Sequence, residues 1–283
     1  MYCAGIVVSV IAAVSAAFVA ALAPVSVTAS SGPVTATLTA TGALGADSIT
    51  GATAVRVRIQ RDGRVAFDGP LRPCRFGCDP DDPTGARFAG LSLADLDGDG
   101  EAEVLIDRSD GFTPCCTLET AILRRNPETG AYGEIDRHWG ESYRVADLDG
   151  DRRAELVTGD LRFYERFAPR LVGFQLPVKV LQLRGPALVD VTRSHPGTVR
   201  RHTRSLGRLL RTTDAIADGR RPGNRVLARA GLRPQLAAYD AEERLLGRRA
   251  IGDRRVAREV ARGRVSAGYR RALLRFLLRT GYR

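Results

Sequence analysis

The chain is poor in the residues that most often carry catalysis. Of its 283 residues only three are histidine, one is tryptophan and one is methionine, and aromatic residues make up 6%. Neither a G-x-S-x-G nucleophile elbow nor an H-E-x-x-H zinc pair is present. His138, beside Trp139, is expected to pack within a strand, whereas His195 and His202 are expected on a solvated helix face. These absences favour a protein without catalytic activity, and an enzyme without a recognisable motif is the alternative.

Long apolar runs are also missing after the first residues. Residues 4–22 are almost wholly small and apolar, and no charged residue precedes Asp47. Val27-Thr28-Ala29 offers a small-x-small cleavage site, so residues 1–29 are predicted to be a signal peptide. An uncleaved membrane anchor is the alternative, because the run is just long enough to span a bilayer. We therefore expect export to the cell envelope or beyond, with no transmembrane segment after cleavage.

Cysteine is scarce, and its placement agrees with export. Cys3 leaves with the signal peptide, and Cys74, Cys78, Cys115 and Cys116 remain. An even number of cysteines in an oxidising compartment predicts disulfides. Pairing of the first two with the last two is favoured, because the vicinal pairing with a short 74–78 loop makes two tight rings. A zinc site is the other alternative, although no histidine lies near these cysteines.

Lysine is nearly absent, since every basic residue except Lys179 is arginine. The net charge of +11 is unevenly spread: residues 1–192 carry 19 basic and 25 acidic groups, and residues 193–283 carry 24 and 7. An acidic front part is thus followed by a strongly basic tail.

Two groups of arginines in this tail have spacings that predict cationic helix faces. They are Arg200, Arg201, Arg204, Arg208 and Arg211, and then Arg248, Arg249, Arg254, Arg255, Arg258 and Arg262. An anionic wall polymer, acidic lipid or the acidic part of the same chain are candidate partners. Few aromatic residues accompany the arginines, and export also argues against nucleic acid. A solvated face enriched in arginine by compositional bias is the alternative.

Period-two alternation and turn residues predict a β-rich region over residues 55–192. Residues 55–60 and 64–67 should form a hairpin around Arg61-Asp-Gly63, and residues 120–123 and 132–139 a second one. Further strands are expected at 161–167, 173–183 and 187–191. Residues 30–54 are small and polar, and are interpreted as a linker or a loose strand.

Helical spacing of apolar residues begins near residue 193 and continues to the end of the chain. Helices are expected at 199–216, from an N-cap at Asn224 to 231, from Pro234 to 246, and from an N-cap at Asp253 to 281. Their amphipathic faces must pack on each other or on the β region.

Two acidic phrases, 52 residues apart, carry the most specific signal. In the first, Asp95, Asp97 and Asp99 present side-chain oxygens, Glu101 would offer its backbone carbonyl, and Glu103 closes the ring. Carboxylates crowded at this spacing repel one another unless a hard cation lies among them, which predicts a calcium loop. Position 12 is an isoleucine in a β-prone run, so the loop should join two strands and is not an EF-hand.

The second phrase repeats the pattern with one departure. Its equivalent residues are Asp147, Asp149, Asp151, Arg153 (through the carbonyl) and Glu155. Arg152 stands where the first phrase has glycine, and a side chain at positive φ costs about 1–2 kcal/mol. The second site is therefore expected to be the weaker one.

Asp-Leu-Asp-Gly-Asp-Gly-x-x-Glu followed by an apolar strand resembles the FG-GAP/VCBS repeat of integrin-like β-propellers and exported bacterial proteins. The resemblance covers about residues 85–195. It implies structural Ca²⁺ bound at inter-strand turns and a partial β-propeller of about two blades. With the helical region over 193–283, the expected fold is α+β.

The expected function is that of an exported, non-catalytic binding or cell-surface module with calcium-stabilised repeats. Its partner would be a protein, a glycan or an anionic envelope polymer. Two alternatives stay open: an exported hydrolase whose active site has no readable motif, and a basic helical tail that binds anionic envelope polymers.

Overall fold

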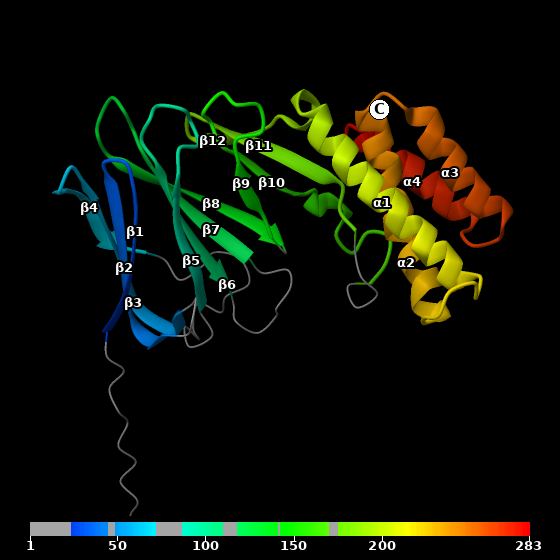
Figure 1. The fold of residues 1–283 in the computed structure, drawn as a ribbon, viewed down its shortest axis with the longest axis horizontal. Coiled ribbons are helices and arrows are strands. Elements are labelled where there is room, and N and C mark those ends of the chain that lie inside the picture. The colour runs from blue at the N-terminus through cyan, green and yellow to red at the C-terminus, as the bar shows by residue number, and fades with distance from the viewer. Residues whose placement is uncertain (1–23, 45–48, 72–86, 110–117, 141, 170–174) are drawn as a thin grey trace, which may run out of the picture.

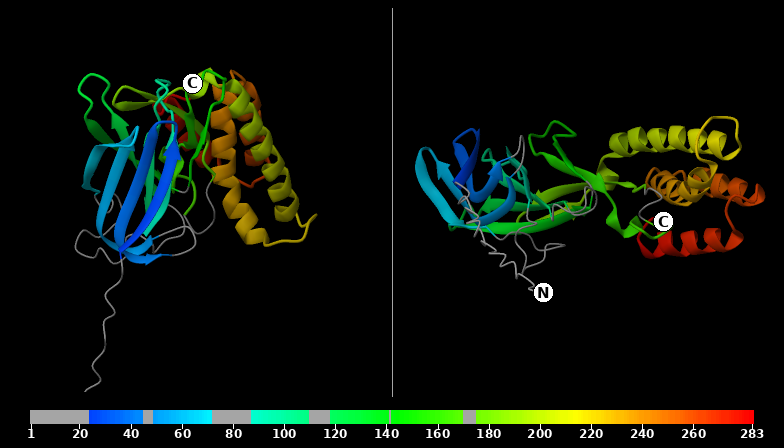
Figure 2. Two further views of the ribbon diagram at one scale, coloured as in Figure 1. Left: turned by 60° about the vertical axis from the view of Figure 1, so that its left-hand side comes forward. Right: turned by 90° about the horizontal axis from the view of Figure 1, so that it is seen from below.

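The computed structural model describes residues 24–44, 49–71, 87–109, 118–140, 142–169 and 175–283. Antiparallel strands occupy the first part of the chain and four α-helices the last part. The strands and the helices lie at opposite ends of the molecule, as Figures 1 and 2 show. The predicted α+β class, with the helices C-terminal, is confirmed.

The first four strands form an antiparallel meander in which each strand pairs with the next. They are β1 (Pro24–Ser31), β2 (Val34–Leu44), β3 (Ile49–Arg61) and β4 (Arg64–Pro70). The described residues of 30–54, which were predicted to be a linker or a loose strand, lie largely in β1, β2 and β3. Signal cleavage stays a prediction, but cleavage after Ala29 would remove residues 24–29, which are most of β1.

The predicted hairpin around residues 61–63 is confirmed. Arg61 pairs with Arg64, and the two residues between them have positive φ: 50° at Asp62 and 75° at Gly63. This is the turn whose twist matches that of the flanking strands, and an Asp-Gly pair is among its preferred sequences.

The second meander contains β5 (Arg87–Ala94), β6 (Glu103–Ser109), β7 (Leu118–Arg125) and β8 (Tyr132–Gly140). It includes the second predicted hairpin, which is confirmed as β7 and β8. A short ladder between β3 and β5 joins this meander to the first in one eight-stranded sheet.

The third meander is a separate four-stranded sheet of β9 (Arg144–Ala146), β10 (Glu155–Gly159), β11 (Val178–Arg184) and β12 (Ala187–Asp190). The strand predicted at 161–167 is wrong. Its first residues form the short 3₁₀ helix η2 (Leu161–Phe163), because the carboxylate of the preceding residue, Asp160, caps the turn.

The middle meander is buried on both faces. Because successive side chains on a strand point to opposite faces, β6 divides its apolar residues between two cores. Val104 and Ile106 pack with the first meander, in a core that includes Val57. Leu105 points the other way and packs with Leu156 of the third meander. The three meanders therefore stack face to face.

The helices are α1 (Pro196–Ala217), α2 (Arg225–Leu245), α3 (Arg249–Ala261) and α4 (Ala267–Arg279). Asn224 caps α2 as predicted, with its side chain accepting from two backbone amides.

Two predicted helix boundaries are wrong. Pro234 lies inside α2, and the burial of Leu232 and Leu236 on either side of it offsets the lost backbone hydrogen bond. Asp253 lies inside α3 and caps nothing, and the single helix predicted over 253–281 is broken at Gly263, which has a φ of 66°.

The helices cover the outer face of the third meander. Val199 of α1 packs on Val157 and Val178, and α1 and α2 lie beside each other over this sheet. At the C-terminus, the hydroxyl of Tyr282 donates to Asp160 at 2.8 Å, which attaches the end of the chain to β10.

Within the described residues the strands close neither a barrel nor a propeller. The prediction of about two repeats missed the first meander, so the described strands form three meanders. No helix in the described ranges has the length and apolar content needed to cross a bilayer. Cys74, Cys78, Cys115 and Cys116 lie outside the described residues.

Candidate metal centre

Both acidic phrases form loops between two strands, as predicted. The first connects β5 to β6, and its backbone is folded around its own carboxylates. Asp95 accepts from the amides of Gly98 (2.6 Å) and Gly100 (3.0 Å), and Glu103 accepts from the amide of Leu96 (2.8 Å). These bonds turn the chain so that the acidic side chains converge.

The second loop, between β9 and β10, repeats these bonds. Asp147 accepts from the amides of Gly150 (2.7 Å) and Arg152 (3.1 Å), and Glu155 accepts from the amide of Leu148 (2.9 Å). Two stretches 52 residues apart have thus folded into the same local structure.

Arg152 adopts the conformation that the sequence comparison predicted. Its φ is 71°, and the equivalent Gly100 has 87°. The substitution therefore leaves the loop intact, at a cost of about 1–2 kcal/mol in backbone strain.

The donor sets fit a hard divalent cation. Each loop brings three carboxylates together so that one oxygen from each lies within 4.8 Å of the others. Those of the first loop are Asp95, Asp97 and Asp99, and those of the second are Asp147, Asp149 and Asp151. Calcium takes six to eight such oxygens at 2.3–2.6 Å.

The residues expected to offer carbonyls use their side chains elsewhere. Glu101 forms ion pairs with Arg61 and with Arg125, the latter at 3.9 Å. The side chain of Arg153 lies across the backbone of Gly98, so the second loop rests on the first. The amide of Ala154 also donates to the carbonyl of Asp95 at 2.9 Å.

The charges around the two loops differ, and the difference acts against the predicted ranking of the two sites. In the first loop, Asp97 accepts from Arg124 at 2.8 Å, so one expected ligand already has a cationic partner. In the described part of the chain, no arginine forms an ion pair with Asp147, Asp149 or Asp151. The second loop therefore has the less neutralised carboxylates.

Glu103 shows the cost of gathering these acids. Burial raises the pKa of Glu103 to about 8, and the nearby carboxylates of Asp97, Asp99 and Asp95 add to the effect, against the hydrogen bond from Leu96. A dication among these groups would favour the ionised form.

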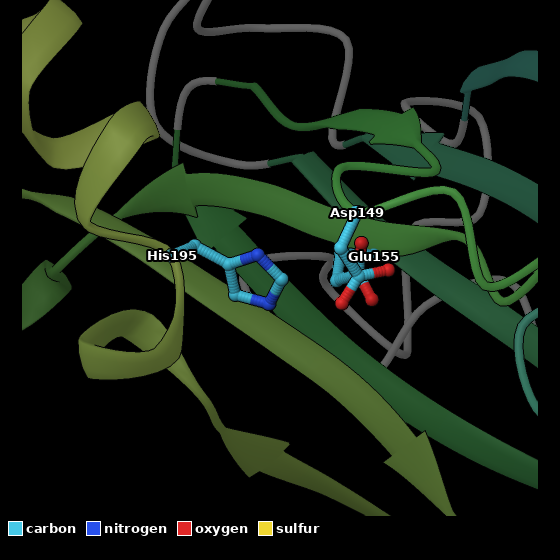
Figure 3. A group of neighbouring side chains, drawn as sticks. All are labelled: Asp149, Glu155 and His195. Carbon is cyan, nitrogen blue, oxygen red and sulfur yellow. The ribbon is translucent and has the colours of Figure 1, made fainter.

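His195 lies beside the second loop, and the expectation of a solvated face is wrong for it. The residue is 8% exposed, and a ring nitrogen lies within 4.8 Å of carboxylate oxygens of Asp149 and Glu155. Figure 3 shows the imidazole turned toward these two side chains. No local sequence signal predicts this contact, because the histidine is 40 residues from Glu155.

His202 lies on α1 with its side chain 37% exposed, so it is only partly on a solvated face. Its Nδ1 lies 2.5 Å from a carboxylate oxygen of Glu242, which is fully buried. Glu242 also accepts from the amide of Val178 (2.7 Å) and the hydroxyl of Thr203 (2.9 Å). Burial alone would lower the pKa of His202, but the hydrogen bond and charge of Glu242 outweigh it and raise that pKa.

A cavity of about 300 Å³ lies next to His202. Its lining includes Ser142, Tyr143 and Trp139, whose ring stacks on that of Tyr143 at 4.5 Å. A histidine oriented through Nδ1 by a buried carboxylate beside a cavity has the arrangement that general-base catalysis needs.

The two predicted groups of arginines behave differently. The five on α1 are all exposed, and none forms an ion pair with the described residues. In the second group, Arg255 pairs with Asp214 at 2.5 Å and Arg249 pairs with Asp253 at 3.2 Å. Arg248 and Arg262 also pair with acids of the tail. The second group is therefore largely neutralised within the helices.

Comparison of the chain with protein-family models, with curated proteins and with solved structures found no match.

Proposed function

We propose that this protein is an exported binding module whose β region is stabilised by structural calcium in its two acidic loops, as in FG-GAP/VCBS repeats. The observation that carries the proposal is the repeated loop geometry. Both loops make the same amide-to-carboxylate bonds and gather three aspartates, although Arg152 replaces a glycine in one of them.

An open partial propeller is the architecture that we propose for the β region. Three four-stranded antiparallel meanders stack face to face, which is how neighbouring propeller blades pack. Helices α1 and α2 cover the outer face of the third meander, where a further blade would otherwise pack.

Calcium is expected to bind with modest affinity, in the range of about 10⁻⁴–10⁻³ M typical of extracellular modules. At roughly ten times the dissociation constant, each filled site should add about 1.4 kcal/mol to the free energy of unfolding. Calorimetric titration and thermal unfolding of the purified chain in millimolar Ca²⁺ measure this.

Matched variants show how much of the heat of calcium binding comes from each loop. Asp95→Asn and Asp147→Asn should each remove the contribution of one loop, whereas Glu128→Gln, in an exposed turn, should leave both. Arg124→Gln should tighten binding at the first loop, because it frees Asp97. The absence of both heat and thermal shift in the wild-type chain would refute calcium binding.

The ligand surface that we propose is the cationic face of α1, and its partner is an anionic polymer of the cell envelope. Arg204, Arg208 and Arg211 line a groove of about 280 Å³ together with Arg248. These α1 arginines are exposed and form no ion pair with the described acidic residues, so their charge is available to an incoming polyanion.

Binding to immobilised polyphosphate tests this surface. Arg204→Gln with Arg208→Gln should weaken binding about tenfold, since two exposed ionic contacts contribute about 0.7 kcal/mol each. The control, Arg270→Gln with Arg271→Gln on α4, removes the same charge from another exposed position and should change little. Equal losses in the two variants, or binding that is insensitive to salt, would contradict the assignment.

A further inference from the structure

His195 occupies a position that helix formation does not explain. It is the N-cap residue of α1, where side chains usually accept a bond from the helix, yet its imidazole makes no capping bond. The ring is turned to the third meander, and within the described residues it has no hydrogen bond or ion pair. The residue is only 8% exposed, yet its ring nitrogens are not sealed from solvent, so a water molecule or an ion can reach the ring.

The backbone of His195 is held from both sides along the chain. The amide of His195 donates to the carbonyl of Thr192 at 3.1 Å, and its carbonyl accepts from the amides of Thr198 and Val199. Thr192 is itself fixed by Asp190 and by the amide of Val180. The backbone that carries the imidazole therefore does not need to be ordered by a ligand on binding.

The space in front of the ring has the dimensions of an ion site. Oxygens of Asp149 and Glu155 and a ring nitrogen of His195 lie within 4.8 Å of one another. Two ligands about 2.0–2.2 Å from one ion are up to about 4.4 Å apart, so a small contraction closes the site.

The carboxylates can serve as ligands while keeping their present contacts. Glu155, which is fully buried, uses Oε2 to accept from Leu148, and its Oε1 receives only a long bond of 3.4 Å from Gln182. Asp149 is exposed and can approach from the solvent side.

We propose that Asp149, Glu155 and His195 form a site for a borderline divalent metal of the zinc class, with water in the remaining positions. Calcium sites take oxygen ligands, whereas an imidazole with two carboxylates suits zinc and its neighbours. The bound ion would join the second loop to the start of α1. The proposal does not affect calcium in the first loop. In the second loop, a metal of the zinc class takes the place of the expected calcium.

Calorimetric titration of Zn²⁺ into the full chain, with about 5 mM Ca²⁺ present to fill oxygen-only sites, tests the proposal. We expect one Zn²⁺ per chain, and visible absorption of bound Co²⁺ that Zn²⁺ displaces. His195→Gln and Asp149→Asn should each weaken binding roughly 10–100-fold or more, because even partners outside the ligand shell contribute that much. His138→Gln, on β8, is the control for imidazole binding elsewhere and should leave the affinity unchanged.

Equal zinc affinity in the wild type and in His195→Gln, or no zinc uptake by the wild type, would overturn the proposal. Thermal unfolding in a chelator checks that each variant is folded. If His195→Gln unfolds at a lower temperature than the wild type, the zinc affinity of Asp149→Asn, a variant at an exposed position, decides the test. The Asp95→Asn titration reports calcium in the first loop separately, so failure of one site is distinguishable from failure of the other.

Discussion

Replacing Arg108 by methionine should lower the free energy of unfolding by about 3–5 kcal/mol, which is the usual cost of removing one partner from a buried ion pair. Arg108 is 1% exposed on β6 and pairs with Glu119, which is fully buried, and with Asp136 at 2.5 Å. Glu134 approaches the same guanidinium at 3.4 Å. Without the arginine, these carboxylates would lose a shared cation, and Glu119 would lose it in a fully buried position.

Denaturant unfolding of the Arg108→Met chain measures this loss, and a double-mutant cycle with Glu119→Met assigns it. Replacing both members of a buried pair by apolar residues of similar volume is often nearly neutral, so the double variant should recover most of the stability. Arg184→Met, whose side chain is exposed on β11, is the control. A loss below about 1 kcal/mol in Arg108→Met, the range of an exposed pair, would show that the network contributes little.

Replacing Glu242 by alanine should cost a similar amount, about 3–5 kcal/mol, at the junction between the sheet and the helices. One carboxylate on α2 accepts from the amide of Val178 on β11 and contacts His202 and Thr203 on α1. Its loss leaves a buried amide without an acceptor and removes the polar contact between three elements. A fall of roughly 10 °C in the unfolding midpoint is expected for a chain of this size.

The Glu242→Gln variant keeps the shape of the side chain and removes its charge, so it measures the two contributions separately. Because the amide oxygen can still accept from Val178, this variant should lose much less stability than Glu242→Ala. The remaining difference from the wild type should depend on pH. Glu242 raises the pKa of His202 above its usual 6.5, so the charged contact stabilises the fold fully below that pH and its contribution disappears as the pH rises through the folded-state pKa. An advantage of the wild type that grows with pH would contradict this pairing.

Local sequence signals were sufficient for the loops and hairpins. The spacing of acids and glycines around Asp95 and Asp147 predicted inter-strand loops, and Asp62-Gly63 predicted a tight turn, because such features depend on backbone conformation within a few residues. The positive φ of Arg152 followed from its alignment with Gly100. These predictions needed no knowledge of distant contacts.

The first meander was predicted only in part, as its β3–β4 hairpin, because it lacks the acidic loop that marks the other two. Its β1–β2 connection is the short turn at Gly32 and Pro33, where the second and third meanders have acidic loops. Small and polar residues over 30–54 suggested a linker, yet β2 buries Val34, Ala36 and Leu38 on one face. Alternation among small residues was a weak signal, and burial against the second meander decided the outcome.

By itself, the sequence determined the α+β class, the strand-to-strand acidic loops and the exposed arginines of α1, since each depends on short-range periodicity and spacing. Only the tertiary structure decided which charges meet: Arg124 with Asp97, His202 with Glu242, and His195 with Asp149 and Glu155. These pairs join residues 27 to 46 positions apart. The two histidine pairings lie on elements brought together by burying Val157, Val178 and Val199. Apolar burial specifies which faces pack, and the polar partners follow from that packing.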